Sequence, residues 1–337
     1  MFSITVRSEK EDKRIPIAVA SDVMFDIQLL LTHIGESFIA KEFSSFDRPA
    51  EALTERFTLF IDPESGGISF RTSAGKGTSR LMDKASAMLM LTMEKMGSGA
   101  GMYWMEDNFK DPRYRSMILY DLIHLSKHMA AERGYTLMFS SEGGEKRFIP
   151  LDTEKAEAFL DKGARTSHGT ISGVLNSVLT KRNIPLYGFT AGDDKVKISF
   201  RSGDAENDAS KYANKAAVIK GTLRYSDDGA LLEIRDVDSV EPFEIMTFGH
   251  IISASRDIPL NGSIDVAVRY ESDTALWKLS YPDLGISASG KDRDLMVAEF
   301  HDYFAFLCDN YLSDDGKELS DEEKEVKDLL ISLTGST

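Results

Sequence analysis

Hydrophobic positions at the start of the chain change their spacing in a way that predicts both strands and helices. Residues 2–7 alternate apolar and polar, which is typical of a strand. Apolar residues three and four apart then predict a helix that Ser21 and Asp22 cap and that runs to about Glu42. Further strands and helices are expected over residues 57–61, 67–71, 80–96, 112–133, 136–140, 146–150 and 153–162. Residues 1–163 are therefore expected to form one α+β domain, whose role the pattern does not indicate.

The middle of the chain has a different pattern of short alternating stretches. They cover residues 170–175, 186–191, 195–200, 217–225 and 231–240, and polar turns separate them. Five such stretches in a segment of this length favour a small closed or nearly closed barrel over residues 165–245.

The last part of the chain returns to a mixed pattern. Alternation predicts strands over residues 264–270, 276–280 and 286–289. A helix is expected from Asp292 or Asp294 onward, and Ser320 with Glu323 forms a capping box for a final helix. Residues 258–337 are thus expected to be a three-stranded sheet with helices. The fold class is α+β, with several domains.

The acidic residues are concentrated in this last part. The chain has a net charge of −15, and residues 258–337 carry 17 Asp and Glu against 7 Lys and Arg, a net of −10. Such a surface repels phosphate backbones and attracts basic proteins. The alternative is that these charges only keep the protein in solution.

The rest of the composition points to a reducing compartment. Cys308 is the one cysteine, so no intramolecular disulfide can form, and it is expected to be a buried structural thiol. The N-terminus lacks the apolar core of a signal peptide, and the longest apolar run, near residues 87–93, is too short to cross a membrane. A cytoplasmic protein without a membrane partner is expected.

The segment Trp277–Leu312 resembles the small ββ(β)α module of HicB-type antitoxins. The resemblance is carried by Pro282, Asp283, Leu284, Gly285 and Gly290, which follow one strand and precede a helix. The C-terminal run KELSDEEKEVKDLL is similar to the last helix of related short antitoxin-like prokaryotic proteins.

The resemblance to antitoxins implies a basic protein as partner. Binding would centre on Tyr281 and Trp277 beside the Pro282–Asp283 turn, because buried aromatic anchors hold an interface that rim charges only steer. Trp277 is alternatively a core residue. HicB-type antitoxins usually add a DNA-binding element, and this segment has no basic helix that would serve as one.

The barrel segment resembles OB-type modules by pattern, and such modules often bind single-stranded nucleic acids. Tyr187 could stack on bases, and Lys195, Lys197 and Arg201 could contact phosphates. Residues 165–245 carry 11 basic and 12 acidic residues, so the basic excess of a strong nucleic-acid binder is missing. Weak binding or none is expected, with the aromatic residues filling the core.

The remaining candidates for chemistry do not combine into a site. His124 and His128 lie four apart on a predicted helix with Asp121 one turn earlier, but Leu125 stands where a metalloprotease helix has glutamate. No metal, cofactor or catalytic residue is therefore assigned.

The sequence favours a non-enzymatic interaction or regulatory protein whose acidic C-terminal module binds a basic partner. Nucleic-acid binding by the barrel is the alternative, and an enzyme whose site is assembled from distant residues is a third class.

Overall fold

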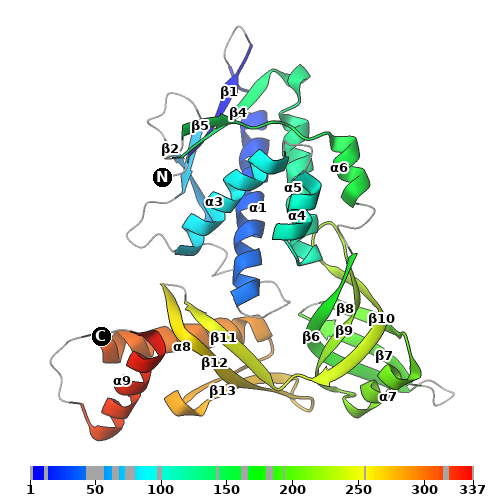
Figure 1. The fold of residues 1–337 in the computed structure, drawn as a ribbon, viewed down its shortest axis with the longest axis vertical. Helices are drawn as coiled ribbons and strands as arrows, with labels where there is room; N and C mark the ends of the chain where they lie inside the picture. The colour runs from blue at the N-terminus through cyan, green and yellow to red at the C-terminus, as the bar shows by residue number, and fades with distance from the viewer. Residues whose placement is uncertain are drawn as a thin grey trace. The chain divides into compact units, whose positions relative to one another are not determined.

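The computed structural model describes residues 3–10, 14–42, 57–62, 68–72, 80–96, 101–141, 144–160, 166–179, 185–192, 194–253, 256–313 and 319–335 (Figure 1). Contacts divide the chain into two compact units, and each contains three segments. Unit 1 comprises Met1–Phe38, Thr54–Ser167 and Arg224–Ala230, and unit 2 comprises Ile39–Leu53, His168–Leu223 and Leu231–Thr337. The α+β fold class is confirmed.

Unit 1 contains an antiparallel sheet in the order β2-β3-β1-β4-β5. Its strands are β1 (Ser3–Ser8), β2 (Leu59–Asp62), β3 (Ile68–Thr72), β4 (Tyr135–Ser141) and β5 (Gly144–Arg147). The alternation at the start of the chain places β1 at the centre, paired with β3 on one side and β4 on the other. Ile4 and Val6 are buried because they occupy the same face of this central strand.

The helices of unit 1 are α1 (Ile17–Glu42), whose last four residues are assigned to unit 2, α3 (Arg80–Met96), α4 (Gly101–Asn108), α5 (Pro112–His128) and α6 (Thr153–Phe159). Helix α1 supplies much of the core, with Ile27, Leu30 and Ile34 fully buried. It begins four residues before the expected cap, so Ser21 and Asp22 lie within it and are exposed. Ala18 and Ala20, which have the highest intrinsic helix propensity, lie in the added first turn.

Helix α5 is shorter than expected. Asp111 caps its start by accepting a hydrogen bond from the Arg113 N–H, and the helix ends at His128. A separate 3₁₀ turn, η2 (Ala131–Arg133), leads to Gly134, whose φ of 69° is left-handed. Gly134, which follows the expected helix of residues 112–133, therefore ends this 3₁₀ turn and not the helix.

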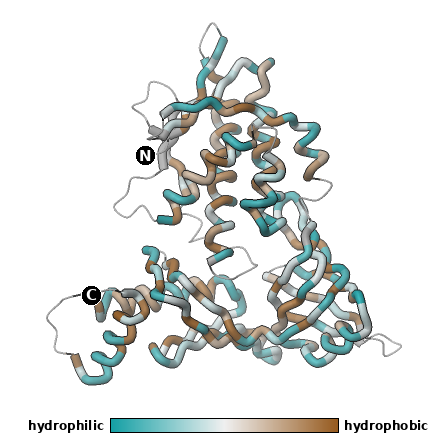
Figure 2. Tube along the Cα trace, viewed as in Figure 1, coloured by the Kyte–Doolittle hydropathy of each residue, from teal (hydrophilic) through white to brown (hydrophobic). Residues whose placement is uncertain are grey.

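Helix α1 is, within the described ranges, the one helix long and apolar enough to cross a membrane (Figure 2). The length of uninterrupted apolar runs does not reveal this helix, because its apolar residues are spread among polar ones. Asp26, His33 and Glu36 on α1 are nevertheless buried, and His33 and Asp26 face partners on α5. These contacts show that α1 packs against α5 within unit 1.

Unit 2 contains a closed five-stranded barrel in the order β10-β8-β7-β6-β9. Its strands are β6 (Thr166–Leu179), β7 (Pro185–Ala191), β8 (Asp194–Phe200), β9 (Lys215–Tyr225) and β10 (Leu231–Pro242). Strand β10 closes the barrel by pairing in parallel with β8, and β6 to β8 pair antiparallel in sequence order. The expectation of a closed small barrel is confirmed.

One helix within the barrel segment was not expected. Helix α7 (Gly203–Lys211) lies between the third and fourth strands, and Ser202 caps it by accepting from the Ala205 N–H. Only Ala205 and Ala209 of this short polar helix are buried, so the apolar spacing that reveals a helix is nearly absent.

The C-terminal part of unit 2 is a sheet in the order β11-β12-β13-β14 rather than the expected three strands. Its strands are β11 (Ile245–Ile252), β12 (Asp257–Glu271), β13 (Leu276–Tyr281) and β14 (Ile286–Gly290). The additional strand is β11, which pairs antiparallel with β12.

The expected domain boundaries differ from this arrangement. A boundary near Ile258 would fall inside β12, one residue after it begins. The barrel and the four-stranded sheet belong to the same compact unit, whereas the expected barrel and C-terminal domain were separate. The boundary near Gly163 lies in residues 161–165, outside the described residues, and the division between the units falls close by, after Ser167.

Two helices follow the sheet of unit 2. Asp292 caps α8 (Arg293–Leu312) by accepting from the N–H groups of Asp294 and Leu295, and α8 packs on the sheet (Figure 1). The predicted capping box of Ser320 and Glu323 begins α9 (Asp321–Thr334), which packs against α8 and β12.

Candidate functional site

Helix α8 is apolar on both its buried side and its exposed side. The buried side carries Phe300 and Phe304, which have no exposed surface, together with Val297 and Leu307. On the opposite side, Leu295, Tyr303 and Phe306 leave 55%, 47% and 54% of their surface exposed. Large apolar side chains gathered on one exposed face mark an interaction surface more often than scattered ones do.

The exposed side of α8 is also acidic. Glu299 and Asp302 are exposed on the same side of the helix, because 3.6 residues per turn brings residues three, four, seven and eight apart together. We call Leu295, Glu299, Asp302, Tyr303 and Phe306 the acidic aromatic face. The rings of Tyr303 and Phe306 lie 5.9 Å apart between centroids, so they form one patch.

No basic side chain is exposed on α8. The helix contains no lysine, and its one arginine, Arg293, is 4% exposed. Beyond the helix, Arg256 binds Asp309 at 2.8 Å and donates to the Ala305 carbonyl oxygen at 3.1 Å. The acidic aromatic face therefore exposes aromatic rings in a region of negative electrostatic potential. Such a surface is suited to a cationic partner.

The position of α8 on the sheet is fixed by a buried histidine. The Ile252 N–H donates to Nδ1 of His301 at 2.8 Å, and the Phe248 ring packs edge-on against the imidazole. Burial, and then His250, lowers the pKa of His301 to about 3, so the ring is neutral at physiological pH and can accept this bond. Because α8 is held in place in this way, binding to the acidic aromatic face does not require the helix to lose conformational entropy.

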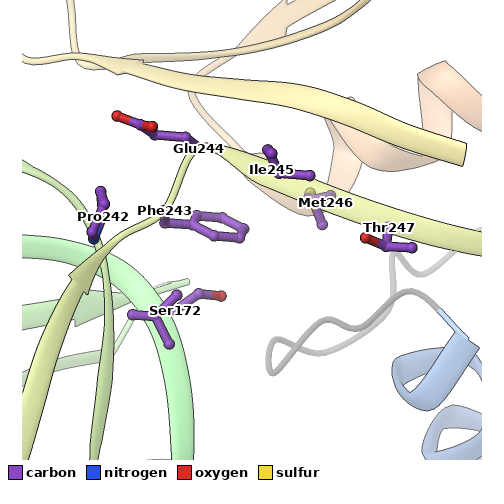
Figure 3. Close-up of a pocket in the computed structure, with 8 residues that line it drawn as sticks. Ser172, Pro242, Phe243, Glu244, Ile245, Met246 and Thr247 are labelled. Atoms are coloured by element: carbon purple, nitrogen blue, oxygen red, sulfur yellow. The ribbon is translucent and has the colours of Figure 1, made fainter.

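Unit 2 also holds a pocket of about 350 Å³ where the barrel continues into the four-stranded sheet. Figure 3 shows Pro242–Thr247 following one another from β10 into β11, with Ser172 of β6 beside Phe243. The walls are mainly apolar, and Val218 completes them.

A buried cation lies next to this pocket. Arg293 Nη1 donates to the Ser172 Oγ at 2.8 Å, and the guanidinium lies 5.6 Å from the Phe243 ring and 5.5 Å from the Trp277 ring. Burial lowers the pKa of Arg293, while Asp294 opposes this effect. These contacts join β6, β13 and α8, so the arginine acts as a structural link within unit 2.

The residues expected at the partner-binding turn have different environments. Trp277 is 7% exposed and packs against the rings of Tyr270 and Phe243, which makes it a core residue. Tyr281 is partly exposed at the end of β13, and burial followed by Asp283 raises its pKa. Pro282 and Asp283 are exposed in the 3₁₀ turn η4 (Pro282–Leu284).

The expected phosphate contacts of the barrel lie on its outer surface. Lys195 and Lys197 are exposed on β8 and pair with Thr190 and Gly188 of β7. Arg201, beyond the end of β8, binds Asp238 at 3.4 Å, and His168 approaches the same carboxylate at 3.1 Å. Arg201 is therefore already engaged with an acidic neighbour.

The aromatic residues of the barrel lie away from these lysines. Tyr187 shares its side of β7 with Phe189, which is 1% exposed and faces the barrel interior. The Tyr187 ring packs edge-on against Phe200 at 5.4 Å, and burial followed by Glu206 raises its pKa. No base could stack on Tyr187 and contact Lys195 and Lys197 across the same face.

The histidines considered as metal ligands do not form a metal site. Among the described residues, no group of three or more His, Cys, Asp or Glu side chains has a geometry that could hold a metal ion. His124 instead packs against the Tyr120 ring. Cys308 is buried as expected, and burial raises the pKa of its thiol to about 11.

Comparison with protein-family models, with curated proteins and with solved structures found no match to this chain.

The acidic aromatic face was missed by sequence reasoning. The spacing of Val297, Phe300, Phe304 and Leu307 accounts for the buried side of α8. Leu295, Tyr303 and Phe306 form a second apolar stripe on the same helix, interrupted by Glu299 and Asp302, and a surface helix usually carries only one apolar stripe.

Proposed function

We propose that this protein is a non-enzymatic interaction protein that binds a basic protein through the acidic aromatic face of α8. One observation carries the proposal: Leu295, Tyr303 and Phe306 are half-exposed on a helix whose exposed charges are all acidic. Aromatic side chains supply most of the binding energy at interfaces, and charges around them guide the encounter.

Two further observations support a basic protein as the partner. Residues 258–337 have a net charge of −10, which disfavours nucleic acids and acidic proteins. The proposed resemblance of the module to HicB-type antitoxins points in the same direction, since it implies pairing with a basic toxin. A cytoplasmic location follows from the same proposal.

The anchor of the interface moves from the Pro282–Asp283 turn to α8 in this proposal. Trp277 is buried and Tyr281 is only partly exposed, so neither offers as much aromatic area as Tyr303 and Phe306. The turn can contribute at the edge of an interface, where contacts add little free energy.

Site-specific photo-crosslinking tests the proposal. A photoreactive amino acid replaces Tyr303 in the full chain, and a control chain carries it in place of Leu232, which is 49% exposed on β10 of the same unit. The captured protein is identified, purified and titrated against the chain by calorimetry. We expect a basic protein that crosslinks at position 303 and not at position 232.

The purified partner then allows a quantitative comparison. Tyr303→Ala with Phe306→Ala should weaken binding by about tenfold or more, since loss of an interface anchor costs over about 1.4 kcal/mol. Leu232→Ala should leave the affinity unchanged. An acidic partner, equal crosslinking at both positions, or full affinity in the double variant would refute the proposal.

Nucleic-acid binding by the barrel is a second candidate. Its support is the topology of the barrel. The third and fifth strands, β8 and β10, pair in parallel, and α7 lies between the third and fourth strands, as in an OB-type barrel. Lys195 and Lys197 lie on the outer surface of β8, the third strand, and OB-type barrels bind their ligands on the face of the second and third strands.

The same barrel lacks two features that nucleic-acid binding uses. Tyr187 and Phe200 pack on the side of the barrel away from the lysines. The turn between the fourth and fifth strands, residues 226–230, belongs to unit 1, where the Ser116 hydroxyl donates to the Ser226 carbonyl oxygen. Binding without stacked bases rests on phosphate contacts alone and is weak.

Fluorescence anisotropy with a labelled oligothymidine tests this second candidate on the full chain. We expect binding weaker than about 1 μM at physiological salt and a shallow salt dependence, because few phosphates are contacted. If the chain binds with submicromolar affinity, and the double variant Lys195→Ala with Lys197→Ala abolishes this binding, nucleic-acid binding becomes the favoured function.

A further inference from the structure

A cluster of ionisable side chains lies between α1 and α5 in unit 1, where Figure 1 shows the two helices side by side. His33 Nδ1 lies 2.6 Å from Asp121 Oδ2, and His128 Nε2 lies 3.7 Å from Asp26 Oδ2. Asp26 and Asp121 are 6% and 3% exposed. A carboxylate at this depth is unfavourable unless opposite charge or hydrogen bonds compensate it.

Asp26 is the least compensated member of the cluster. Its Oδ2 is buried and makes no hydrogen bond within the described part of the chain. Burial first, and then the negative charges of Asp121 and Asp22, raises the pKa of Asp26 to about 7. An exposed aspartate would have lost its proton about three pH units lower.

The groups that face Asp26 do not reverse this effect. From α5, His128 approaches it, but burial, with Arg133 of η2 and His124, lowers the pKa of His128, and only Asp22 acts in the opposite direction. Arg133 Nη1 lies 3.5 Å from His128 Nδ1, on the far side of the ring from Asp26. His33 pairs with Asp121, and Glu36 is a further buried acid on α1.

We propose that the contact between α1 and α5 is a proton-responsive element, in which Asp26, facing His128, takes up a proton as the helices pack and releases it as the pH rises. A group whose pKa is raised by folding stabilises the folded state fully below its unfolded pKa and loses that effect as the pH passes its folded pKa. The contribution of Asp26 to the stability of unit 1 is therefore largest in acid, decreases as the pH rises from about 4, and is lost above about pH 7.

The two tryptophans allow unit 1 to be followed in the full chain. Trp104 on α4 belongs to unit 1 and Trp277 belongs to unit 2. In a Trp277→Phe background, Trp104 fluorescence reports the urea unfolding of unit 1. The folding equilibrium constant of unit 1 should fall by up to about tenfold for each pH unit above about 4, as expected for one linked proton, and less steeply near pH 6.5, where the lowered pKa of His128 opposes the effect of Asp26.

Asp26→Asn should remove most of this pH dependence, because the amide cannot ionise. Asp107→Asn is the matched control, since Asp107 is an exposed acid on α4 whose side chain is 79% exposed. It should keep the slope of the parent protein. The inference is overturned if Asp26→Asn and Asp107→Asn show the same pH dependence.

Infrared difference spectroscopy gives a readout that does not depend on stability. The native protein should show a protonated carboxylic acid band in mild acid that disappears as the pH rises through neutrality. Asp22→Asn should move this transition to lower pH, because one charge that repels the Asp26 carboxylate is removed. If Asp26→Asn does not fold, the Asp22→Asn variant provides the test in its place. Absence of any carboxyl group titrating near neutrality refutes the inference.

Discussion

Arg293 is a charged side chain in a place where charge is costly. Its guanidinium contacts the Ser172 hydroxyl and the rings of Phe243 and Trp277, so three segments of unit 2 depend on it. An arginine suits this position because its planar group stacks on rings and donates in fixed directions, which the ammonium of lysine cannot do.

Replacing this arginine by lysine should destabilise unit 2. We expect Arg293→Lys to lower the free energy of unfolding by about 3 kcal/mol, because a buried charge is left with poorer partners. Ser172→Ala removes only the hydroxyl and should cost about 1 kcal/mol. Urea unfolding followed by circular dichroism measures both, and equal effects would mean that stacking on the rings contributes nothing.

His301 makes unit 2 sensitive to acid. Its pKa is lowered to about 3 by burial and His250, so the neutral ring is favoured by folding. The stabilisation is present above the unfolded pKa near 6.5 and is lost as the pH falls toward the folded value. In a Trp104→Phe background, Trp277 fluorescence should show unit 2 weakening below about pH 6.5, and His301→Gln should flatten that dependence. A slope that His301→Gln leaves unchanged would contradict this assignment.

At the level of elements, the barrel depends on a close approach of two strands at Gly173. A Cβ at this position would lie 2.2 Å from the Thr190 carbonyl oxygen and 2.8 Å from the Phe189 ring. Because the nearest atom belongs to the backbone, it cannot move aside without disturbing the pairing of β6 with β7.

Gly173→Ala should therefore destabilise the barrel by about 1–3 kcal/mol, the usual cost of overpacking. Gly203→Ala is the control, because nothing lies within 4 Å of a Cβ there and the residue begins α7. Thermal unfolding measures both variants. A melting temperature that falls equally in both would show that glycine flexibility, rather than space, sets the effect.

Elements whose determinants are local could be predicted from the sequence. The capping box of Ser320 and Glu323 and the alternation of β12 and β13 were read correctly, because neighbouring residues decide them. Strand β11 was missed, although its buried residues alternate, because its role depends on pairing with β12. The parallel closure of the barrel by β8 and β10 likewise joins strands that are distant in sequence.

The candidate site was less predictable than the fold. A sequence shows that α8 is apolar on two sides but not which side the sheet covers. Trp277 and Tyr303 are both aromatic residues in an acidic segment, and only the packing against Phe243 and Arg293 shows that Trp277 is internal. Surface position is a property of tertiary packing, which local pattern does not determine.

At the level of the whole molecule, charge should control how fast the proposed partner is found. Glu299→Gln with Asp302→Asn leaves the aromatic anchors in place but removes two charges from the acidic aromatic face. We expect slower association and a weaker salt dependence with a nearly unchanged dissociation rate, since rim charges act mainly on encounter. Stopped-flow measurements at low and physiological salt test this, and a change confined to dissociation would contradict it.

The segment Arg224–Ala230 has a consequence for the order in which the protein is made. It belongs to unit 1, where Gly229 has a φ of 81° and a Cβ there would meet Met117. During translation, unit 1 therefore remains incomplete until residue 230 has left the ribosome, by which time four strands of the barrel have been synthesised. A chain ending at Ser167 should accordingly melt at a lower temperature than unit 1 does in the full chain, because α5 lacks this covering segment.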